Sequence, residues 1–307
     1  MGTIRPILHV LLPMALGACL RAVGLFEQRE GELLRKFVVR FALPLFIFFS
    51  LYQAEAQSLA AMAPMVAAFV LMTAVMFLLG WTAAMPFEDV GRRTAVHACV
   101  TFGNWGWMGL GVVGALLGAG GTQRVVYFTM FWWPVFYGFG LPVGLIHARR
   151  SRKGVPLRST LAVAAPPLAA MGLGLALNLT GVRVPKLAVE VLRPFAGMTV
   201  PLILLSVGML LDVRRIGGTF WPVAAVCSAT LVIGPLVGLG LAGILAPDEV
   251  TYGVIILEGA MPVATLVPIL EENFKMDVEV VSTAILASTV LSMVTLPVVA
   301  ALVLAAA

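Results

Sequence analysis

The chain has 307 residues, of which 61% are hydrophobic and 11% are charged, and its mean hydropathy is +1.03. Soluble domains carry roughly a quarter of charged residues, so this composition excludes an ordinary water-soluble protein. The net charge of +5 is a poor argument for nucleic-acid binding, because most basic residues lie in short connections between apolar runs. They indicate instead an orientation in a membrane and contact with anionic lipid.

Apolar runs of about 20 residues, the length that crosses a bilayer as a helix, recur along the whole chain. They cover residues 4–24, 34–53, 59–83, 95–118, 124–147, 157–179, 187–211, 219–245, 250–270 and 280–304. No remaining stretch is long enough for a soluble domain, and the first run lacks a convincing signal-peptide cleavage site. We therefore expect an all-α membrane protein with ten transmembrane helices.

The distribution of Lys and Arg predicts the orientation of these helices. Most of these residues lie in the loops that follow odd-numbered spans, and basic loops stay in the cytoplasm. We therefore expect both termini on the outer side of the cell inner membrane. Cys19, Cys99 and Cys227 all fall within predicted spans, and their odd number predicts buried free thiols without a disulfide framework or a metal site.

A shift of 157 residues superimposes several features of the two halves of the chain. It carries Gly17 and Gly24 onto Gly174 and Gly181. Five spans per half is an odd number, so the second half would enter the membrane from the opposite side, as in many secondary transporters. The predicted organisation is a first inverted repeat over residues 1–147, a cytoplasmic linker over 148–156 and a second inverted repeat over 157–307. Chance matches of Gly and Pro are the alternative.

Two stretches interrupt the spans that contain them, residues 101–111 with four glycines and residues 258–265 with Pro262. Shifted by 157, Asn104 falls on Met261, so the two breaks occupy matching places. Broken backbone persists in hydrocarbon only where it lines protein or a wet cavity, and the start of a half-helix attracts anions. We predict that the breaks meet near the membrane midplane and bind a small anion. Packing glycines and an ordinary kink are the alternative.

The polar residues of the breaks suggest separate roles. The Asn104 amide could donate to a substrate carboxylate, and it shares a spacing of 3, 4 and 3 with Thr94, His97 and Thr101, which predicts one helical face. An unpaired Glu258 would cost about 2.5–3.5 kcal/mol in a membrane, so we expect it to carry a coupling ion, H⁺ or Na⁺. Alternatively, Glu258 caps a half-helix or pairs with Asn104. His97 is a second ion-coupling candidate, unless it is simply solvated. The predicted substrate-binding residues are Gly103, Asn104, Trp105, Gly106, Met261, Pro262, Val263 and Thr265.

Several motifs together resemble the auxin efflux carrier family. They are Arg40-Phe-Ala-Leu-Pro44-Leu-Phe-Ile-Phe-Phe-Ser50, Gly103-Asn104, Leu257-Glu-Gly-Ala-Met-Pro262-Val-Ala-Thr265, Ser282-Thr-Ala-Ile285 and Thr295-Leu-Pro297. The resemblance covers the whole chain and implies a fold similar to that of bile acid sodium symporters and sodium/proton antiporters. In that fold, ten spans form two inverted repeats of five, and spans 4 and 9 cross as unwound helices.

The resemblance also implies roles for single residues. Asn104 matches the crossover asparagine of the family, and Pro262 matches the crossover proline of the second repeat. The crossover proline of the first repeat is replaced by Gly111, so unwinding there would depend on glycine flexibility. Glu258 sits where the related sodium symporters place a sodium ligand. Several short bacterial members are described as carriers of malonate, malate or related organic acids.

These observations favour a secondary transporter for a small organic anion. A domain of spans 3–5 and 8–10 would move against spans 1–2 and 6–7. We expect no enzyme, because neither a nucleotide-binding motif nor a nucleophile with its base is visible, and no cofactor beyond the coupling ion. Two alternatives stay open, a Na⁺ or H⁺ antiporter with Glu258 as its cation site and a receptor that does not translocate its ligand. A homodimer is also open, since similar folds often dimerise.

Overall fold

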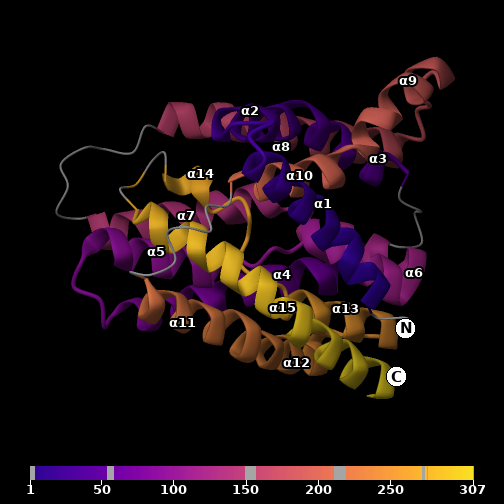
Figure 1. Ribbon diagram of the computed structural model, residues 1–307. Helices are drawn as coiled ribbons and strands as arrows, with labels where there is room; N and C mark the ends of the chain where they lie inside the picture. Colours follow the sequence, from indigo (N-terminus) through magenta and orange to yellow (C-terminus); the bar gives the residue numbers. More distant parts are fainter. Residues whose placement is uncertain are drawn as a thin grey trace. The chain divides into compact units, whose positions relative to one another are not determined.

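The computed structural model describes residues 4–53, 59–148, 157–210, 219–271, 274 and 276–306, and within these residues it contains helices and connections but no β-sheet (Figure 1). The predicted all-α class is therefore confirmed. The chain divides into two compact units, and each unit takes segments from both halves of the sequence. The first unit comprises Met1–Ile7, Ala61–Pro156 and Asp212–Ala307, and the second comprises Leu8–Ala60 and Leu157–Leu211.

The first unit contains both sequence stretches that were predicted to be broken. In it, α15 packs along α11, and α12 packs against α13 (Figure 1). Its elements are α4 (Leu59–Ala84), α5 (Val90–Thr101), α6 (Trp107–Thr129), α7 (Trp132–Ala148), α11 (Phe220–Ser228), the π-helical turn η4 (Ala229–Ile233), α12 (Gly234–Leu245), α13 (Glu249–Gly259), α14 (Pro268–Glu271) and α15 (Val278–Ala306).

The second unit is a smaller helical group in which α3 packs on α8 and α10 packs on α2. Its elements are most of α1 (Ile4–Ala22), which enters this unit at Leu8, and α2 (Gln28–Phe37), the π-helical turn η1 (Val38–Ala42), α3 (Leu43–Tyr52), α8 (Leu157–Thr180), α9 (Lys186–Gly197) and α10 (Thr199–Leu210). Both π-helical turns precede a helix with proline in its first turn, Pro44 after η1 and Pro235 after η4. Proline lacks an N–H and crowds the preceding turn, which accounts for the widened turn at each place.

The offset of 157 residues recurs in the packing of the second unit. A side chain at Gly17 of α1 would collide with the carbonyl of Leu205 in α10, at 2.1 Å from a Cβ atom, so the two helices touch through backbone there. Gly174 of α8 meets the carbonyl of Phe48 in α3 in the same way, at 2.7 Å. Gly174 lies 157 positions after Gly17, and Leu205 lies 157 positions after Phe48. The sequence offset therefore relates two equivalent helix contacts.

The ends of helices match in a similar way. Gly24 after α1 and Gly181 after α8 both adopt a left-handed backbone, with φ of 74° and 68°, which glycine adopts without steric cost. Asp89 caps the start of α5 and Asp248 caps the start of α13, and each carboxylate accepts a backbone N–H three residues later. The two half-helices that lead to the breaks therefore begin in the same manner.

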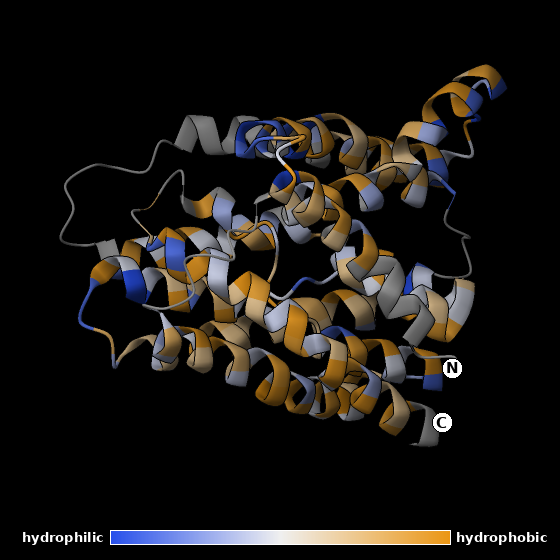
Figure 2. Cartoon of the chain, in the orientation of Figure 1, coloured by the Kyte–Doolittle hydropathy of each residue, from blue (hydrophilic) through white to orange (hydrophobic). Residues whose placement is uncertain are grey.

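Four stretches of the described chain are long and apolar enough to cross a membrane. They are Met62–Ala84, Lys186–Ser206, Phe220–Leu245 and Val278–Val303, and a fifth arises if Trp107–Thr129 and Pro134–His147, bent by 48°, form one broken span. Figure 2 shows α12 and α15 largely in hydrophobic colours, whereas hydrophilic residues gather at α2 and at the start of α5. The number of ten crossings and their inverted arrangement stay predictions.

Two other expectations concern loops and cysteines. Residues 149–156 of the predicted linker and the basic loop around residues 211–218 lie outside the described residues, so the predicted orientation stays a prediction. Cys99 and Cys227 are buried free thiols, as expected, but the free thiol of Cys19 is exposed on α1. The prediction of burial is wrong for Cys19 because an apolar span can turn any of its residues outward.

Candidate functional site

Both predicted breaks are present in the first unit. Helix α5 ends at Thr101, the backbone of residues 102–106 is extended or turned, and α6 begins at Trp107. Helix α13 ends at Gly259, and regular structure resumes only at α14. Gly106 has φ of 83°, a conformation that other residues rarely adopt, so this glycine permits the chain to re-enter a helix. The break therefore lies before Gly111, which is inside α6, and the expected unwinding at that position is wrong.

The two breaks cross each other and pair through their backbones. Gly103 lies opposite Val263 in a single antiparallel bridge. The Asn104 N–H donates to the Pro262 carbonyl at 2.6 Å, and the Ala264 N–H donates to a carbonyl of the first break at 2.8 Å. Buried peptide groups without a partner are costly, so each break supplies the partners that the other lost. Segments about 160 residues apart in sequence are joined in this way.

Glu258 lies at the end of α13 with none of its surface exposed. Its Oε2 accepts the Gly106 N–H, at the start of α6, over 3.4 Å, which places a carboxylate at the positive end of that helix dipole. A Cβ atom at Gly109 would come within 2.0 Å of Oε1, so the carboxylate also fills the space beside this glycine. The start of α6 is therefore occupied by a side chain of the protein, in agreement with the capping alternative.

The remaining polar atoms at the crossing include several that have no hydrogen-bond partner. Both amide atoms of Asn104, Oε1 of Glu258 and Oγ1 of Thr265 are buried and unpartnered in the described structure. No ion pair to Glu258 occurs among the described residues, and Asn104 does not satisfy it. Unpaired buried polar groups are rare because each costs roughly 1–3 kcal/mol. Other unpartnered buried atoms occur among the described residues, for example in Trp132, Thr199 and Thr219, but three of these side chains lie together on the two crossing segments.

Two other predicted binding residues are buried next to the crossing segments. Met261 is 1% exposed and Trp105 is 2% exposed. The indole of Trp105 covers Gly103, where a Cβ atom would lie 2.2 Å from its Nε1, and it packs edge-on against Phe69 of α4 and Trp132 of α7. Trp105 therefore belongs to an aromatic cluster with Phe69 and Trp132.

One residue outside the predicted set also supports the crossing. Ser288 of α15 accepts the Val263 N–H at 3.2 Å through its hydroxyl, which in turn donates to the Ile285 carbonyl. In the sequence, the spacing of Ser288, Ser292 and Thr295 predicts only that their hydroxyls share one face of a helix. The contact of Ser288 with the broken backbone depends on how α15 packs. The spacing of these hydroxyls therefore does not by itself identify Ser288 as a residue of the crossing.

His97 does not join the crossing. It lies on α5 with both ring nitrogens engaged elsewhere, Nδ1 with His147 and Nε2 with the Phe77 carbonyl, each at 2.9 Å. Of the predicted polar face, Thr94, His97 and Thr101 lie on α5 and Asn104 does not. The hydroxyls of Thr94 and Thr101 donate to carbonyls of their own helix, and Asn104 lies beyond the end of α5 because the glycine-containing break begins first.

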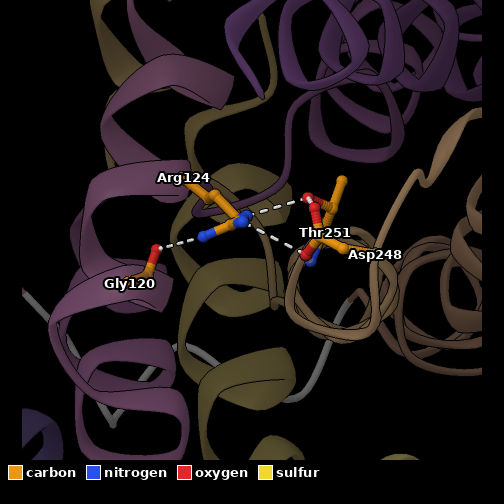
Figure 3. Close-up of polar contacts among 4 residues, drawn as sticks. All are labelled: Gly120, Arg124, Asp248 and Thr251. Carbon is orange, nitrogen blue, oxygen red and sulfur yellow. Dashed lines mark hydrogen bonds and ion pairs between the residues drawn. The ribbon is translucent and has the colours of Figure 1, made fainter. Parts of the chain in front are cut away.

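The start of α13 is tied to α6 by a cluster of polar contacts (Figure 3). The Arg124 guanidinium donates to the Asp248 carboxylate at 3.1 Å and to the Thr251 hydroxyl at 2.8 Å. Burial alone would raise the pKa of the Asp248 carboxyl, but hydrogen bonds from Thr251 and Arg124, together with the Arg124 charge, hold this pKa below its usual value. The half-helix that leads to Glu258 is therefore fixed at its far end.

Comparisons with known proteins place the chain in a family. A family model described as membrane transport protein matches the chain over residues 3–153 and 148–300. An uncharacterized transporter of Methanothermobacter thermautotrophicus is 28% identical over 305 residues, covering 97% of each chain. An uncharacterized transporter of Methanocaldococcus jannaschii is 22% identical over 303 residues, covering 94% of each chain. The chain therefore belongs to the membrane transport protein family, the auxin efflux carrier family that its motifs resemble, and is a multi-pass membrane protein.

Proposed function

We propose that the protein is a secondary active transporter that moves a small organic anion, a carboxylate such as malonate or malate, across the cytoplasmic membrane. One observation carries the proposal. Two broken helices cross in the first unit, and their buried polar side chains Asn104, Glu258 and Thr265 have atoms without partners. A stable protein would fill such positions with apolar groups, unless a ligand supplies the missing hydrogen bonds for part of a working cycle.

The position of Glu258 changes the expected mode of anion binding. Since its carboxylate occupies the start of α6, the cargo carboxylate would not sit on those backbone amides. It would instead accept from the Asn104 amide and the Thr265 hydroxyl, which have no partner in the described structure. A second negative group beside Glu258 would be repelled unless Glu258 is protonated or cation-bound. Co-binding of H⁺ or Na⁺ at Glu258 would therefore couple the cargo to an ion gradient.

The two compact units suggest the form of the movement. The unit with the crossing contains the helices of spans 3–5 and 8–10, and the other contains most of spans 1–2 and 6–7. The breaks are paired within the first unit, so it could carry the site as one body. We propose ten spans in two inverted five-helix repeats, with both termini outside, and alternating access by displacement of the first unit.

A thermal-shift screen of the purified protein tests class and site together. Mono- and dicarboxylates are compared with and without Na⁺, for the wild type and for Asn104→Ala. We expect one or more acids to raise the unfolding temperature of the wild type and to lose this effect in the variant. Stabilisation of both proteins to the same extent would place the anion elsewhere, and no stabilisation by any acid would count against an organic anion.

The coupling role of Glu258 has its own test. Uptake into liposomes is measured for the wild type and Glu258→Gln under opposed pH and Na⁺ gradients. Glutamine keeps the size of the side chain but cannot ionise, so we expect uptake to become insensitive to the gradient that drives the wild type. Unchanged dependence on both gradients would remove the coupling role and leave Glu258 as a helix cap.

A second candidate function is favoured by the same carboxylate. Oε1 of Glu258 is buried without a partner, and no ion pair neutralises it among the described residues. A Na⁺ or H⁺ antiporter would use this carboxylate as its cation site without any organic cargo. Such a protein would exchange Na⁺ for H⁺ in liposomes that contain no acid, whereas the proposed anion transporter would not. A receptor would bind an acid saturably without exchanging it across the membrane.

A further inference from the structure

A pair of histidines lies in the first unit apart from the crossing. It consists of His97 on α5, which has no exposed surface, and His147 in the last turn of α7, which is partly exposed. Nδ1 of His97 and Nε2 of His147 are 2.9 Å apart, and Nε2 of His97 is 2.9 Å from the Phe77 carbonyl of α4. Three helices therefore meet at two imidazole rings.

The Phe77 carbonyl determines which ring nitrogens of the two histidines carry hydrogens. A carbonyl oxygen can only accept, so Nε2 of His97 carries a hydrogen and donates to Phe77. In the neutral ring, Nδ1 of His97 is then an acceptor, and the hydrogen between the two rings belongs to Nε2 of His147. One nitrogen is left over, Nδ1 of His147, which is the acceptor of the partly exposed ring.

We propose that His97 and His147 together form a binding site for one proton. The proton adds to Nδ1 of His147. The hydrogen on Nε2 of that ring can then pass to Nδ1 of His97, which leaves His147 neutral and places the charge on His97. A second proton is excluded, because two N–H groups would then face each other across 2.9 Å. The site thus takes one proton in all, and it carries that proton inward by one hydrogen bond.

Several charged and ionisable groups lie near this site. The guanidinium of Arg93 on α5 donates to the carbonyls of Phe87 and Met85. Arg92 is paired with Asp277. Helix α4 carries no ionisable side chain. The other ionisable side chains on α5, on α7 and on the helices packed against α5 are Cys99 of α5, Tyr137 of α7, Cys227 of α11 and Glu279 of α15. Helix α14, whose Leu270 meets Gly140 of α7, also contains Glu271.

The pair is not required by the helical framework itself. At the offset of 157 residues, the second half of the chain has Val254 and Leu304 in place of His97 and His147. The histidine pair therefore has no counterpart at these positions of the second half. When the proton is bound, the hydrogen bond between α5 and α7 becomes charge-assisted and about twice as strong. Acid would then join α7 more firmly to the half-helix that leads into the crossing, independently of the ion proposed at Glu258.

Nitrogen-15 NMR of histidine-labelled protein in lipid nanodiscs tests the proposal without any cargo. The chain has three histidines, His9, His97 and His147, and the nitrogen shifts distinguish donor, acceptor and charged rings. On titration from about pH 8 to 4, where histidines change charge, we expect His97 and His147 to shift together at one midpoint and to gain one proton in total. His147→Gln should abolish proton uptake by His97 over this range. His9→Gln is the matched control and should leave the shared titration unchanged.

Three results would overturn the proposal. They are the gain of a full proton by each ring at separate midpoints, the absence of any uptake before unfolding, and an Nδ1-protonated neutral His97. The control protein alone decides among these, so the proposal stays testable if the other variant does not fold. The same titration in Glu258→Gln should be unchanged, which separates a failure here from a failure of the proposed transport function.

Discussion

Glu258 can occupy the crossing only because residue 109 has no side chain. A Cβ atom there would lie 2.0 Å from Oε1 and 2.6 Å from the carboxyl carbon of Glu258. Both partners are in the interior, where a rearrangement has few alternatives because protein cores are close-packed. Gly109 is therefore a positioning residue for the carboxylate, although it makes no polar contact itself.

The first prediction concerns Gly109→Ala. In an ordinary helix, this change stabilises by up to about 1 kcal/mol, but here the methyl group displaces a buried carboxylate. Overpacking of this kind costs roughly 1–3 kcal/mol, so we expect a lower unfolding temperature and loss of the Na⁺ or pH dependence assigned to Glu258. Gly138→Ala in α7 is the matched control, because no atom lies within 4 Å of its added Cβ. Equal unfolding temperatures for both variants would contradict the packing described here.

The second prediction concerns the stability cost of Asn104. Its amide is fully buried and neither polar atom has a partner, so replacement by an apolar residue of similar size removes a cost of about 1–3 kcal/mol. We expect Asn104→Leu to unfold at the same or a higher temperature than the wild type without cargo. Asn178→Leu is the control, since the Asn178 amide donates to the Tyr52 carbonyl at 2.9 Å. Similar losses in both variants would show that Asn104 is a structural residue.

At this scale, sequence reasoning found the residues whose chemistry is unusual for a membrane span. An asparagine, a glutamate and a proline in apolar runs are costly, so Asn104, Glu258 and Pro262 were identifiable from their surroundings alone. Gly109 and His147 were not. Their importance depends on which side chain the fold brings against them, and a glycine in a membrane helix or a histidine at its end has many ordinary explanations.

At the scale of elements, each half-helix that enters the crossing is anchored at its start. Asp248 caps α13 and accepts from Arg124 of α6. At the start of α5, Arg92 pairs with Asp277 at 3.2 Å, and the Asp277 N–H donates to the carbonyl of Gly91. Exposed ion pairs contribute little to stability by themselves. These two ion pairs instead hold elements in position, because each joins elements from different halves of the chain.

The third prediction uses the pH dependence of the Asp248 anchor. A carboxyl whose pKa is lowered on folding contributes stability that is present above its unfolded pKa of about 4 and is lost as pH falls through the lower folded value. Hydrogen bonds from Thr251 and Arg124 lower this pKa. We therefore expect the unfolding temperature of the wild type to fall in acid more steeply than that of Arg124→Gln. The control Arg92→Gln should retain the wild-type slope, and three parallel curves would refute the assignment.

The sequence located helices better than it located their ends. The break in span 4 was expected to extend to Gly111, but the extended backbone is confined to residues 102–106. The four glycines look alike in sequence, and only Gly106 has a left-handed backbone. Which glycine breaks a helix depends on the crossing segment, since the pairing of Gly103 with Val263 determines where backbone partners are available.

At the scale of the whole molecule, the two halves of the sequence repeat the same contacts within the second unit. Arg21 donates to the Met209 carbonyl at 3.2 Å, and Asn178 donates to the Tyr52 carbonyl at 2.9 Å. The members of these bonds are again related by 157 positions. A periodicity of Gly and Pro alone predicted this offset. The division into two units needs contacts between distant segments, and the resemblance to a known fold supplied that expectation.

The two halves of the chain differ in the polar residues near the crossing. Glu258 corresponds at the same offset to Thr101, whose hydroxyl is satisfied by its own helix. The acid at the crossing, like the histidine pair, is thus present in one half only. This difference between the halves is consistent with the proposed roles of these groups in ion and cargo binding.

Counterflow in proteoliposomes tests the central claim most directly. Vesicles loaded with an excess of an unlabelled carboxylate that stabilises the wild type are diluted into a trace of the labelled acid. We predict that the wild type accumulates the label transiently, and that Asn104→Leu, although folded and at least as thermostable, does not. Equal counterflow by Asn104→Leu, or stabilisation of the wild type by the acid without any counterflow, would contradict the account.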